Sequence, residues 1–225
     1  MNTPTPQDKN IPVITFDGGA GTGKGTIRAR LAKTLGFHGL DSGVLYRALG
    51  LVCHKKDLTD MNDIVNAALT MNIHVDGDTI YLDGVDETAT IRSNFASHLA
   101  HPIARIPEVR LALREFQIHM RKHPGLVADG RDQGFIFDDA VRFFFTAKPE
   151  VVAERSVHRS KQHGIIEDYE TVLKHIHERN ESDRTRVIDP MIPHPEAIHI
   201  DTTELTPDEV HNLVLLHLNK KGFQL

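Results

Sequence analysis

Cysteine, tryptophan and long apolar runs are scarce or missing in this sequence of 225 residues, which contains one cysteine and no tryptophan. A single cysteine excludes an intrachain disulfide and any zinc site built from several cysteines. In the apolar run Leu51-Val52-Cys53 we expect Cys53 to serve as a small buried hydrophobe. No apolar run approaches the ~20 residues of a membrane span, and the N-terminus lacks the cationic and apolar regions of a signal peptide. We therefore expect a cytoplasmic protein without a membrane partner.

Charge and histidine content also exclude several classes of function. The net charge of −5 gives no general electrostatic reason to bind nucleic acid. Fifteen histidines are scattered along the chain, and none forms a His-Glu-x-x-His metal motif, so we assign none to a metal. The composition, 40% hydrophobic and 25% charged, is that of an ordinary globular protein. Nothing in it indicates an oligomer, so we expect a monomer.

One glycine-rich stretch, Gly18–Thr26, organises the chain. An apolar run over residues 12–16 predicts a buried strand before it, and Ile27, Leu31 and Leu35 recur at helical spacing after it. A strand, a glycine-rich turn ending in Gly-Lys and a helix form a phosphate-binding loop. Glycines let backbone N–H groups point at phosphate oxygens, and the helix N-terminus adds partial positive charge. The stretch therefore predicts a site for a nucleoside triphosphate, with Lys24 on its terminal phosphates.

The loop departs from the usual pattern at one position. Gly25 stands where a serine or threonine normally meets Mg²⁺, and the hydroxyl comes one residue later, at Thr26. The alternative interpretation is a glycine-rich turn that only caps a helix. Strand, glycines, lysine and helix all favour the phosphate loop. The predicted ATP-binding residues are Gly18, Gly19, Ala20, Gly21, Thr22, Gly23, Lys24, Gly25 and Thr26.

The rest of the sequence alternates between strand and helix patterns. A polar tail over residues 1–10 is expected to be disordered. Helices are predicted at about 24–35, from Ser42 onward, and at 61–69, 91–101, 109–122, 149 onward, 169–184 and 207–220, with Pro102 and Pro107 lying between two of them. Residues 37–40 are expected to be a short connecting segment. Further strands are predicted at 126–129, 142–145 and 198–201. This alternation predicts an α/β fold in which helices flank a parallel sheet.

A different pattern interrupts the alternation. Residues 72–75 and 79–82 alternate apolar and polar side chains around an Asp-Gly turn, which is typical of a β-hairpin. We expect a single domain with a core at about 11–72 and 106–220. The hairpin would belong to an inserted subdomain at about 73–105.

Three charged segments follow predicted strand ends or helix starts. Asp129-Gly130-Arg131-Asp132 comes directly after an apolar strand, and the alternative is a solvated turn with a local ion pair. Ser42 to Arg47 begins a helix that would present Tyr46 and Arg47, although Tyr46 could instead pack in the core. Arg179, Asp183 and Arg186 are spaced to lie along one face of a single helix, or they form an ordinary solvated face. Arginine binds phosphate through a planar fork, so these segments suit an anionic ligand.

Together these segments resemble the cytidylate kinases of bacteria, which are nucleoside monophosphate kinases. The resemblance covers about residues 11–220. It rests on Asp17-Gly18 with the loop to Thr26, on Leu40-Asp41-Ser42-Gly43-x-x-Tyr46-Arg47, on Asp129-Gly130-Arg131-Asp132-x-Gly134, and on Arg179…Asp183…Arg186. It implies a P-loop kinase that phosphorylates CMP and dCMP with ATP and Mg²⁺, with an inserted monophosphate-binding subdomain and a short lid at about 155–168.

The resemblance also implies roles for single residues. Lys24, Arg131, Arg179 and Arg186 would handle the phosphates, the last two when the lid closes. Thr26 would lie near the nucleotide-bound Mg²⁺, with no other direct metal ligand. Arg155 and Arg159 resemble lid arginines less closely. Asp183 would contact the sugar, and Asp129 and Asp132 would orient arginines or accept bonds from the substrate. The residues implied to bind the acceptor nucleotide are Ser42, Tyr46, Arg47, His101, Arg110, Asp129, Arg131, Asp132 and Asp183.

Four positions depart from the family pattern. His101 stands where a serine usually helps to read the cytosine edge, and a histidine is larger and can titrate. Gln133 and Phe135 replace a methionine and a threonine, and Asn180 replaces an aspartate. Three hypotheses follow: a (d)CMP kinase, a related kinase for another acceptor such as UMP or a small metabolite, or a nucleotide-binding protein without catalysis. We favour the first, because Lys24, Arg131 and Arg186 are intact.

Overall fold

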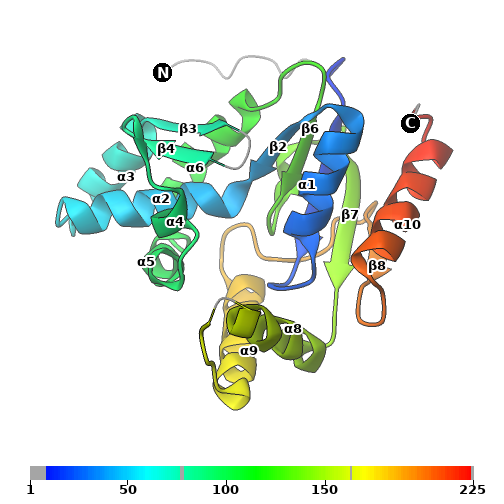
Figure 1. The fold of residues 1–225 in the computed structure, drawn as a ribbon. Helices are drawn as coiled ribbons and strands as arrows, with labels where there is room; N and C mark the ends of the chain where they lie inside the picture. The colour runs from blue at the N-terminus through cyan, green and yellow to red at the C-terminus, as the bar shows by residue number, and fades with distance from the viewer. Residues whose placement is uncertain (1–8, 77–78, 163, 224–225) are drawn as a thin grey trace. The chain divides into compact units, whose positions relative to one another are not determined.

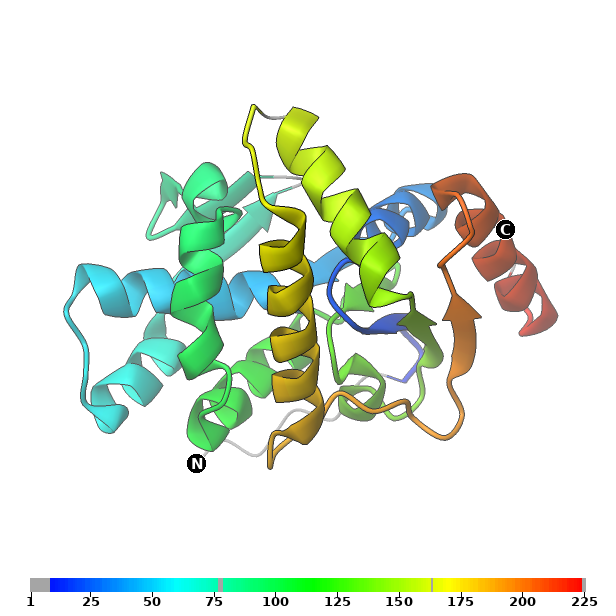
Figure 2. The ribbon, with the colours of Figure 1, turned by 90° about the horizontal axis from the view of Figure 1, so that it is seen from below.

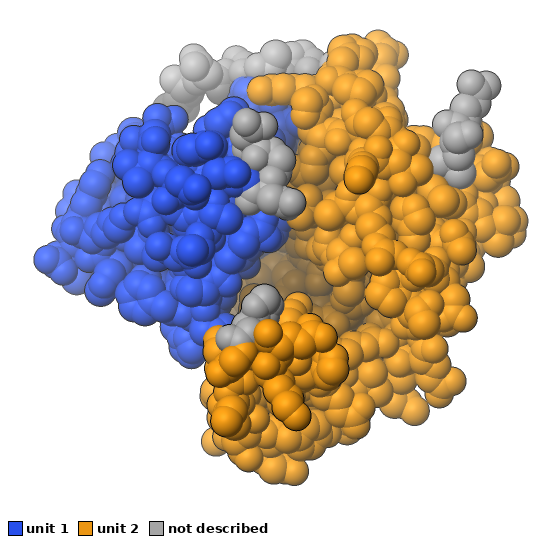
Figure 3. Space-filling view, in the orientation of Figure 1, with its two compact units in different colours: residues 1–6, 41–120 blue, residues 7–40, 121–225 orange. Residues whose placement is uncertain are grey.

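The computed structural model describes residues 9–76, 79–162 and 164–223. The chain divides into two compact units, shown in Figure 3. Within the described residues, unit 1 is residues 41–120 and unit 2 is residues 9–40 together with 121–223. Residues 1–8 of the predicted tail and residues 77–78 of the predicted hairpin turn lie outside the described residues. Residues 9 and 10 of the tail form a turn, and Lys9 donates to Asp138 at 3.1 Å.

Unit 2 contains the sheet that carries the phosphate loop. Its five strands are β1 (Val13–Gly18), β2 (His38–Asp41), β6 (Leu126–Asp129), β7 (Val141–Thr146) and β8 (Ile198–Asp201), in the order β2-β6-β1-β7-β8. Strand β1 pairs in parallel with β6 and β7, and β7 pairs in parallel with β8. The register sets Phe16 beside Asp129. Parallel strands end at one edge of a sheet, so the end of β6 adjoins the start of the phosphate loop.

The core of unit 2 lies between this sheet and two helices. Ile14 and Phe16 alternate along β1 and are fully buried, together with Phe145 on β7. Helices α1 (Lys24–Leu35) and α10 (Pro207–Lys220) cover them with Ile27, Leu31, Val210, Val214 and Leu218 (Figure 1). The apolar spacing of α1 therefore packs the helix against the sheet directly behind the phosphate loop.

Two long helices form a second packing layer in unit 2. Helices α8 (Pro149–Gln162) and α9 (Tyr169–Thr185) lie side by side in Figures 1 and 2. Their shared core is Val152, Ala153 and Ile176. Asp168 caps α9 by accepting a hydrogen bond from the Thr171 N–H at 2.9 Å. This pairing gives the charged residues of α9 a rigid support.

Unit 1 combines helices with a small antiparallel sheet. Its helices are α2 (Ser42–Lys55), α3 (Met61–Thr70), α4 (Thr88–Ile91), α5 (Asn94–Ile103) and α6 (Pro107–His119). Strands β3 (Ile73–Asp76) and β4 (Thr79–Leu82) form the predicted hairpin, and β5 (Val85–Asp86) pairs with β4 after a turn at Asp83-Gly84. Cys53 is buried, as expected.

Several predicted elements differ from the structure. Residues 38–41 form strand β2 rather than a connecting segment, and Gln133–Ile136 forms a short helix, α7, that the sequence pattern did not indicate. Pro102 lies inside the last turn of α5 instead of between helices. Arg186 lies just beyond α9 in extended conformation, so the prediction that one helix carries Arg179, Asp183 and Arg186 was wrong. Strand β2 gains its hydrogen bonds from a neighbour distant in sequence, which a local pattern does not record.

Candidate active site

The phosphate loop turns sharply between β1 and α1. Gly18 and Gly21 have φ angles of +133° and +70°. A Cβ on Gly18 would lie 2.0 Å from the Phe145 carbonyl oxygen, and one on Gly21 would lie 2.3 Å from Val152 Cγ1. Both positions therefore require glycine. The N-cap residue Gly23 has no side chain to occupy the first amides of α1, which suits the binding of an anion.

Lys24 is buried within this loop. Its ammonium group donates a hydrogen bond to the Gly19 carbonyl at 2.7 Å. Burial, with a further contribution from nearby Arg131, lowers the pKa of Lys24 from 10.5 to about 7. The negative charges of Asp129 and Asp17 oppose this fall, and a bound phosphate would add negative charge that favours the ammonium form of Lys24.

Two residues from distant elements brace the loop. The Asn180 side chain of α9 accepts a hydrogen bond from the Ala20 N–H at 3.3 Å. The Thr202 hydroxyl, just after β8, donates to the Thr22 carbonyl at 3.0 Å. In the sequence, Asn180 stood out only because the family usually has an aspartate at that position. No sequence pattern indicated that Thr202 would contact the phosphate loop.

The loop after β6 carries ion pairs of unit 2. Arg131 donates to Asp183 with an Nε–Oδ2 distance of 2.7 Å, and both side chains are 17% exposed. Arg186 approaches Asp183 at 3.6 Å and Asp132 at 3.9 Å. Although burial opposes it, the charges of Arg131, Arg179 and Arg186 and the Arg131 hydrogen bond hold the pKa of Asp183 below its ordinary value. The predicted acidic and basic residues of unit 2 thus come together.

Asp129 has a partner that sequence analysis missed. Arg28 donates to its carboxylate over 2.6 Å, and the two side chains are 15% and 11% exposed. Arg28 follows Lys24 by four residues on α1, so both lie on one face of the helix. That spacing is the signal that could have identified Arg28 as a site residue.

In unit 1, three of the predicted acceptor-binding residues form pairwise contacts. Arg47 donates to Asp41 at 2.9 Å. The Arg110 guanidinium lies over the Tyr46 ring, 5.4 Å from its centroid, and donates to the Ala104 carbonyl at 3.2 Å. The remaining predicted residues of unit 1 differ in exposure: Ser42 is buried at the first position of α2, and His101 is exposed on α5.

Comparisons with known proteins place the chain in a family. A family model described as cytidylate kinase matches residues 14–220. The chain belongs to the cytidylate kinase family. A cytidylate kinase of Acinetobacter baumannii is 40% identical over 222 residues, covering 94% of this chain and 97% of the relative. A cytidylate kinase of Klebsiella pneumoniae is 37% identical over 220 residues, with 94% and 97% coverage. A kinase transfers a phosphoryl group, so this family member is a phosphotransferase.

The structure shows where the departures from the cytidylate kinase pattern lie. Asn180 contacts the phosphate loop, and Gln133 is fully buried at the start of α7. Phe135 is 42% exposed, with its ring 5.0 Å from that of His194. Arg155, considered as a lid arginine, donates to the carbonyls of Thr202, Thr203 and Leu205. Its guanidinium therefore braces the chain after β8.

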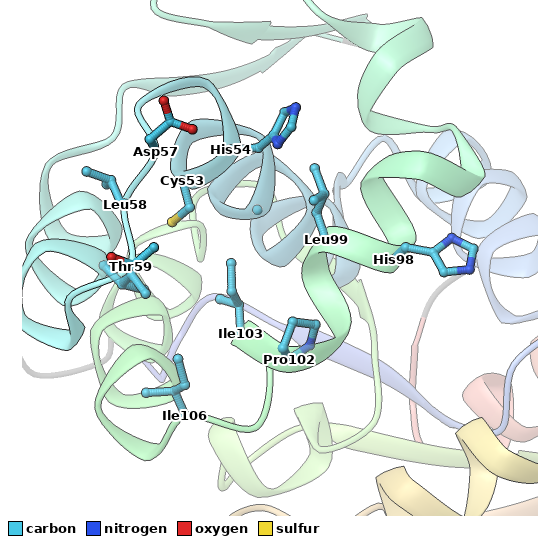
Figure 4. A pocket seen from close by; sticks show the side chains of 12 residues that line it. Cys53, His54, Asp57, Leu58, Thr59, His98, Leu99, Pro102, Ile103 and Ile106 are labelled. Atoms are coloured by element: carbon cyan, nitrogen blue, oxygen red, sulfur yellow. The ribbon is translucent and has the colours of Figure 1, made fainter.

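A cavity in unit 1 is separate from the predicted site residues of this family. It has a volume of about 440 Å³ and lies among α2, the start of α3 and α5 (Figure 4). Leu58, Leu99, Ile103 and Ile106 give it apolar walls, and Cys53 lines it as well. None of its lining residues is a predicted substrate or ATP contact.

The described residues offer neither a metal-binding cluster nor a helix that could span a membrane. These residues contain no cluster of three or more histidine, cysteine or acidic side chains arranged to hold a metal ion. Their helices are all too short or too polar to pass through a bilayer.

Proposed function

We propose that this protein transfers the γ-phosphoryl group of ATP to CMP and dCMP, giving ADP and CDP or dCDP. The observation that carries the proposal is that a chain of the cytidylate kinase family has a phosphate loop and, in the same unit, Arg131 paired with Asp183. The relatives named cytidylate kinase, up to 40% identical in the comparisons above, support CMP as the acceptor. The second candidate, UMP or another small acceptor, follows only from His101 at the position expected to read the base, and the cytidylate kinase relatives do not favour it.

ATP would bind at Gly18–Thr26. The first amides of α1 and the buried Lys24 ammonium group would hold its phosphates. Mg²⁺ would enter with ATP, since magnesium keeps several waters and is commonly held by substrate phosphates. The Thr26 hydroxyl fits this role because it is exposed in the first turn of α1. When bound, the ion would neutralise charge on the β- and γ-phosphates.

We take the acceptor contacts from the family resemblance, residue by residue. Arg47 and Arg110 carry cationic groups in unit 1, and Ser42 supplies a hydroxyl. In unit 2, Asp183 would accept hydrogen bonds from the sugar. The proposed acceptor contacts, taken together, are Ser42, Tyr46, Arg47, His101, Arg110, Asp129, Arg131, Asp132 and Asp183.

Transfer itself needs positioning and charge stabilisation rather than covalent catalysis. Arg131, Arg179 and Arg186 would stabilise the negative charge on the transferring group. Arg131 and Arg186 each form an ion pair with Asp183, at 2.7 Å and 3.6 Å, which restrains both guanidinium groups. Fork-shaped guanidinium groups suit the equatorial oxygens of a phosphoryl group.

We further propose that movable segments exclude water from the reaction. Residues 73–105 would act as the monophosphate-binding insertion, and residues 155–168 as the lid. The lid segment contains Gly164, with a φ of +74°, and Ile166, which is 97% exposed. We also propose that the protein acts as a monomer in the cytoplasm, where ATP and nucleoside monophosphates are available.

A panel of acceptors tests the proposed function. ADP release would be measured with CMP, dCMP, UMP, dUMP, AMP and GMP at equal concentration. We expect turnover with CMP and dCMP, and Lys24→Ala should abolish it by removing the loop cation. Turnover with UMP alone would support the second candidate. ATP binding without turnover for any acceptor would indicate a non-catalytic protein.

His101 provides a test of base preference. In His101→Ser, the ratio of the KM for CMP to the KM for UMP should fall about tenfold. A serine can hydrogen-bond the cytosine without occupying the space that the base needs. His98→Ser is the matched control, since His98 is also an exposed histidine on α5. An unchanged CMP-to-UMP ratio in His101→Ser would remove His101 from the acceptor site.

A further inference from the structure

Asp17 is a buried carboxylate that the proposed function leaves without a role. It is the penultimate residue of β1, directly before Gly18, and it is 5% exposed. One of its oxygens accepts the Gln133 N–H at 2.8 Å, and the other accepts the Gly134 N–H at 2.7 Å. Both partners lie 116 or more positions further along the chain. The residue therefore joins the start of the phosphate loop to the start of α7.

These bonds fix the far end of the segment that carries Arg131. Its near end is fixed one residue earlier on β1, where the Phe16 carbonyl accepts the Gly130 N–H at 3.0 Å. Two consecutive residues of β1 thus hold both ends of residues 130–134, with Arg131 and Asp132 between them. The next residue of β1 opens the phosphate loop. The same stretch of backbone consequently sets the positions of both segments.

Helix α7 depends on Asp17 for its cap. The local N-cap residue, Asp132, makes no side-chain capping bond to the helix. A Cβ on Gly134 would lie 3.2 Å from Asp17 Oδ2, so glycine leaves room for the carboxylate. Asp17 supplies from β1 the acceptor that the helix lacks at its own N-terminus.

The chemistry of this position requires a carboxylate. Two N–H donors face its two oxygens, and an asparagine would direct an NH₂ group at one of them. Burial, followed by the charge of Asp132, raises the pKa of Asp17 from 3.8 to about 7, while the two backbone bonds and Lys24 oppose this rise. A buried carboxylate is costly to keep unless it is hydrogen-bonded, and the Gln133 and Gly134 N–H groups supply those bonds.

We propose that Asp17 is a positioning residue for phosphoryl transfer, which fixes residues 130–134 so that Arg131 is aligned with phosphates bound at the loop Gly18–Thr26. This inference rests on the proposed function above. Asp17 acts through Arg131 and touches neither nucleotide. Loss of its two bonds would free the Arg131 segment while leaving the glycines of the phosphate loop in place.

A double-mutant cycle tests the proposal. Asp17→Asn should lower kcat about 10- to 100-fold, since small misplacements of a catalytic group have effects of this size. KM for ATP should change by less than about threefold, because the loop amides remain. In an Arg131→Lys background, the same substitution should lower kcat by less than about threefold. If the two effects on kcat instead multiply, or if Asp17→Asn leaves kcat unchanged, the proposal is wrong.

Two further variants control for simple loss of stability. Asp60→Asn makes the same chemical change at a carboxylate that caps α3, and kcat should be unaffected. Gly134→Ala crowds the Asp17 carboxylate from the opposite side, so it should reproduce a smaller fall in kcat without adding to that of Asp17→Asn. If Asp17→Asn does not fold, Gly134→Ala paired with Arg131→Lys completes the same cycle.

Amide exchange tests the positioning without any turnover. In Asp17→Asn, the amides of Gln133 and Gly134 should exchange at least about tenfold faster, while those of Val127 and Ala128 on β6 keep their protection. Equal exchange at Gln133 and Gly134 would overturn the proposal. If the wild-type protein phosphorylates no monophosphate, the proposed function fails, and the exchange measurement still decides whether Asp17 fixes this segment.

Discussion

At the scale of single residues, Lys24 links nucleotide binding to protonation. Its pKa is lowered to about 7 by burial and by Arg131, so the free protein holds much of this lysine neutral above pH 7. Bound phosphates would restore the ammonium form. We predict that ATP binding takes up protons, up to about one per site and most strongly near pH ~8–9.

Calorimetry in buffers of different ionisation enthalpy measures this uptake. The binding enthalpy should vary linearly with the ionisation enthalpy of the buffer, with a slope equal to the number of protons. Lys24→Met is the control, because it keeps the length of the side chain but cannot titrate. A slope of zero for the wild-type protein near pH ~8 would show that Lys24 is already charged before ATP binds.

Asp17 gives folding stability the opposite pH dependence to an ordinary salt-bridged acid. Its pKa is raised by burial and by Asp132 to about 7 in the folded protein, against 3.8 ordinarily, so the folded state binds the proton more tightly. Its contribution to stability is fully present below pH ~4 and is lost as pH rises through ~7. The facing charges are Asp132 and Lys24.

Urea unfolding of the wild type and of Asp17→Asn over a range of pH tests this prediction. The unfolding free energy of the wild type relative to Asp17→Asn should fall between pH ~5 and ~8, by up to a few kcal/mol. Subtracting the variant removes the titration of groups that both proteins share. A difference that stays constant over this range would mean that Asp17 remains charged throughout.

At the scale of secondary-structure elements, α10 offers a clear test of local sequence signals. Thr206 accepts the Glu209 N–H at 3.3 Å, and the Glu209 carboxylate accepts the Thr206 N–H at 2.8 Å. A threonine followed three residues later by a glutamate is the sequence signature of a capping box, and the structure shows both of its bonds. Thr206→Ala should therefore lower the unfolding free energy by about 1 kcal/mol.

Urea unfolding with Thr206→Ser as the matched variant isolates the cap. Serine keeps the accepting oxygen, so most of the stability should return. The caps of α1 show the contrast. Its N-cap is Gly23, which makes no side-chain capping bond to the first turn of that helix. Equal losses in the alanine and serine variants would point to the threonine methyl group instead of the cap.

At the scale of the whole molecule, the division into two units predicts local differences in stability. Leu113 on α6 is fully buried in unit 1, and Leu218 on α10 is fully buried in unit 2. Truncating either to alanine should cost about 2–5 kcal/mol. We expect Leu113→Ala to raise amide exchange mainly within residues 41–120, and Leu218→Ala mainly within residues 9–40 and 121–223.

Hydrogen exchange read out by mass spectrometry distinguishes the two responses. The same Leu→Ala change is made in both variants, so the size of the lost side chain is matched. If either variant raises exchange equally in all described segments, the chain opens as one cooperative body. The two units would then be compact regions of the chain that do not unfold independently of each other.

Much of the fold and part of the site could be predicted from local sequence. The turn of the phosphate loop, the helix at 207–220 and the apolar strands were predicted because each depends on neighbours within a few residues. The prediction for Arg186 was wrong because α9 ends at Thr185, one residue earlier, and the side chain still reaches Asp183 at 3.6 Å. The inserted region, the lid and the residue roles remain predictions.

The sequence by itself determined the residue types: glycines that permit the loop, a lysine that follows them, and arginines suited to phosphate. Only the tertiary structure decided their partners. The register of β1 against β6 sets Phe16 beside Asp129 and lets Asp17 hold Gln133 and Gly134. Arg28 with Asp129 and Asn180 with Ala20 are likewise pairs over 100 positions apart. The pairing of β1 with β6 follows from parallel strands that end at one edge of a sheet, and the other pairs follow from helices packed beside that edge. No local pattern in the chain records such contacts, because their partners are distant in sequence.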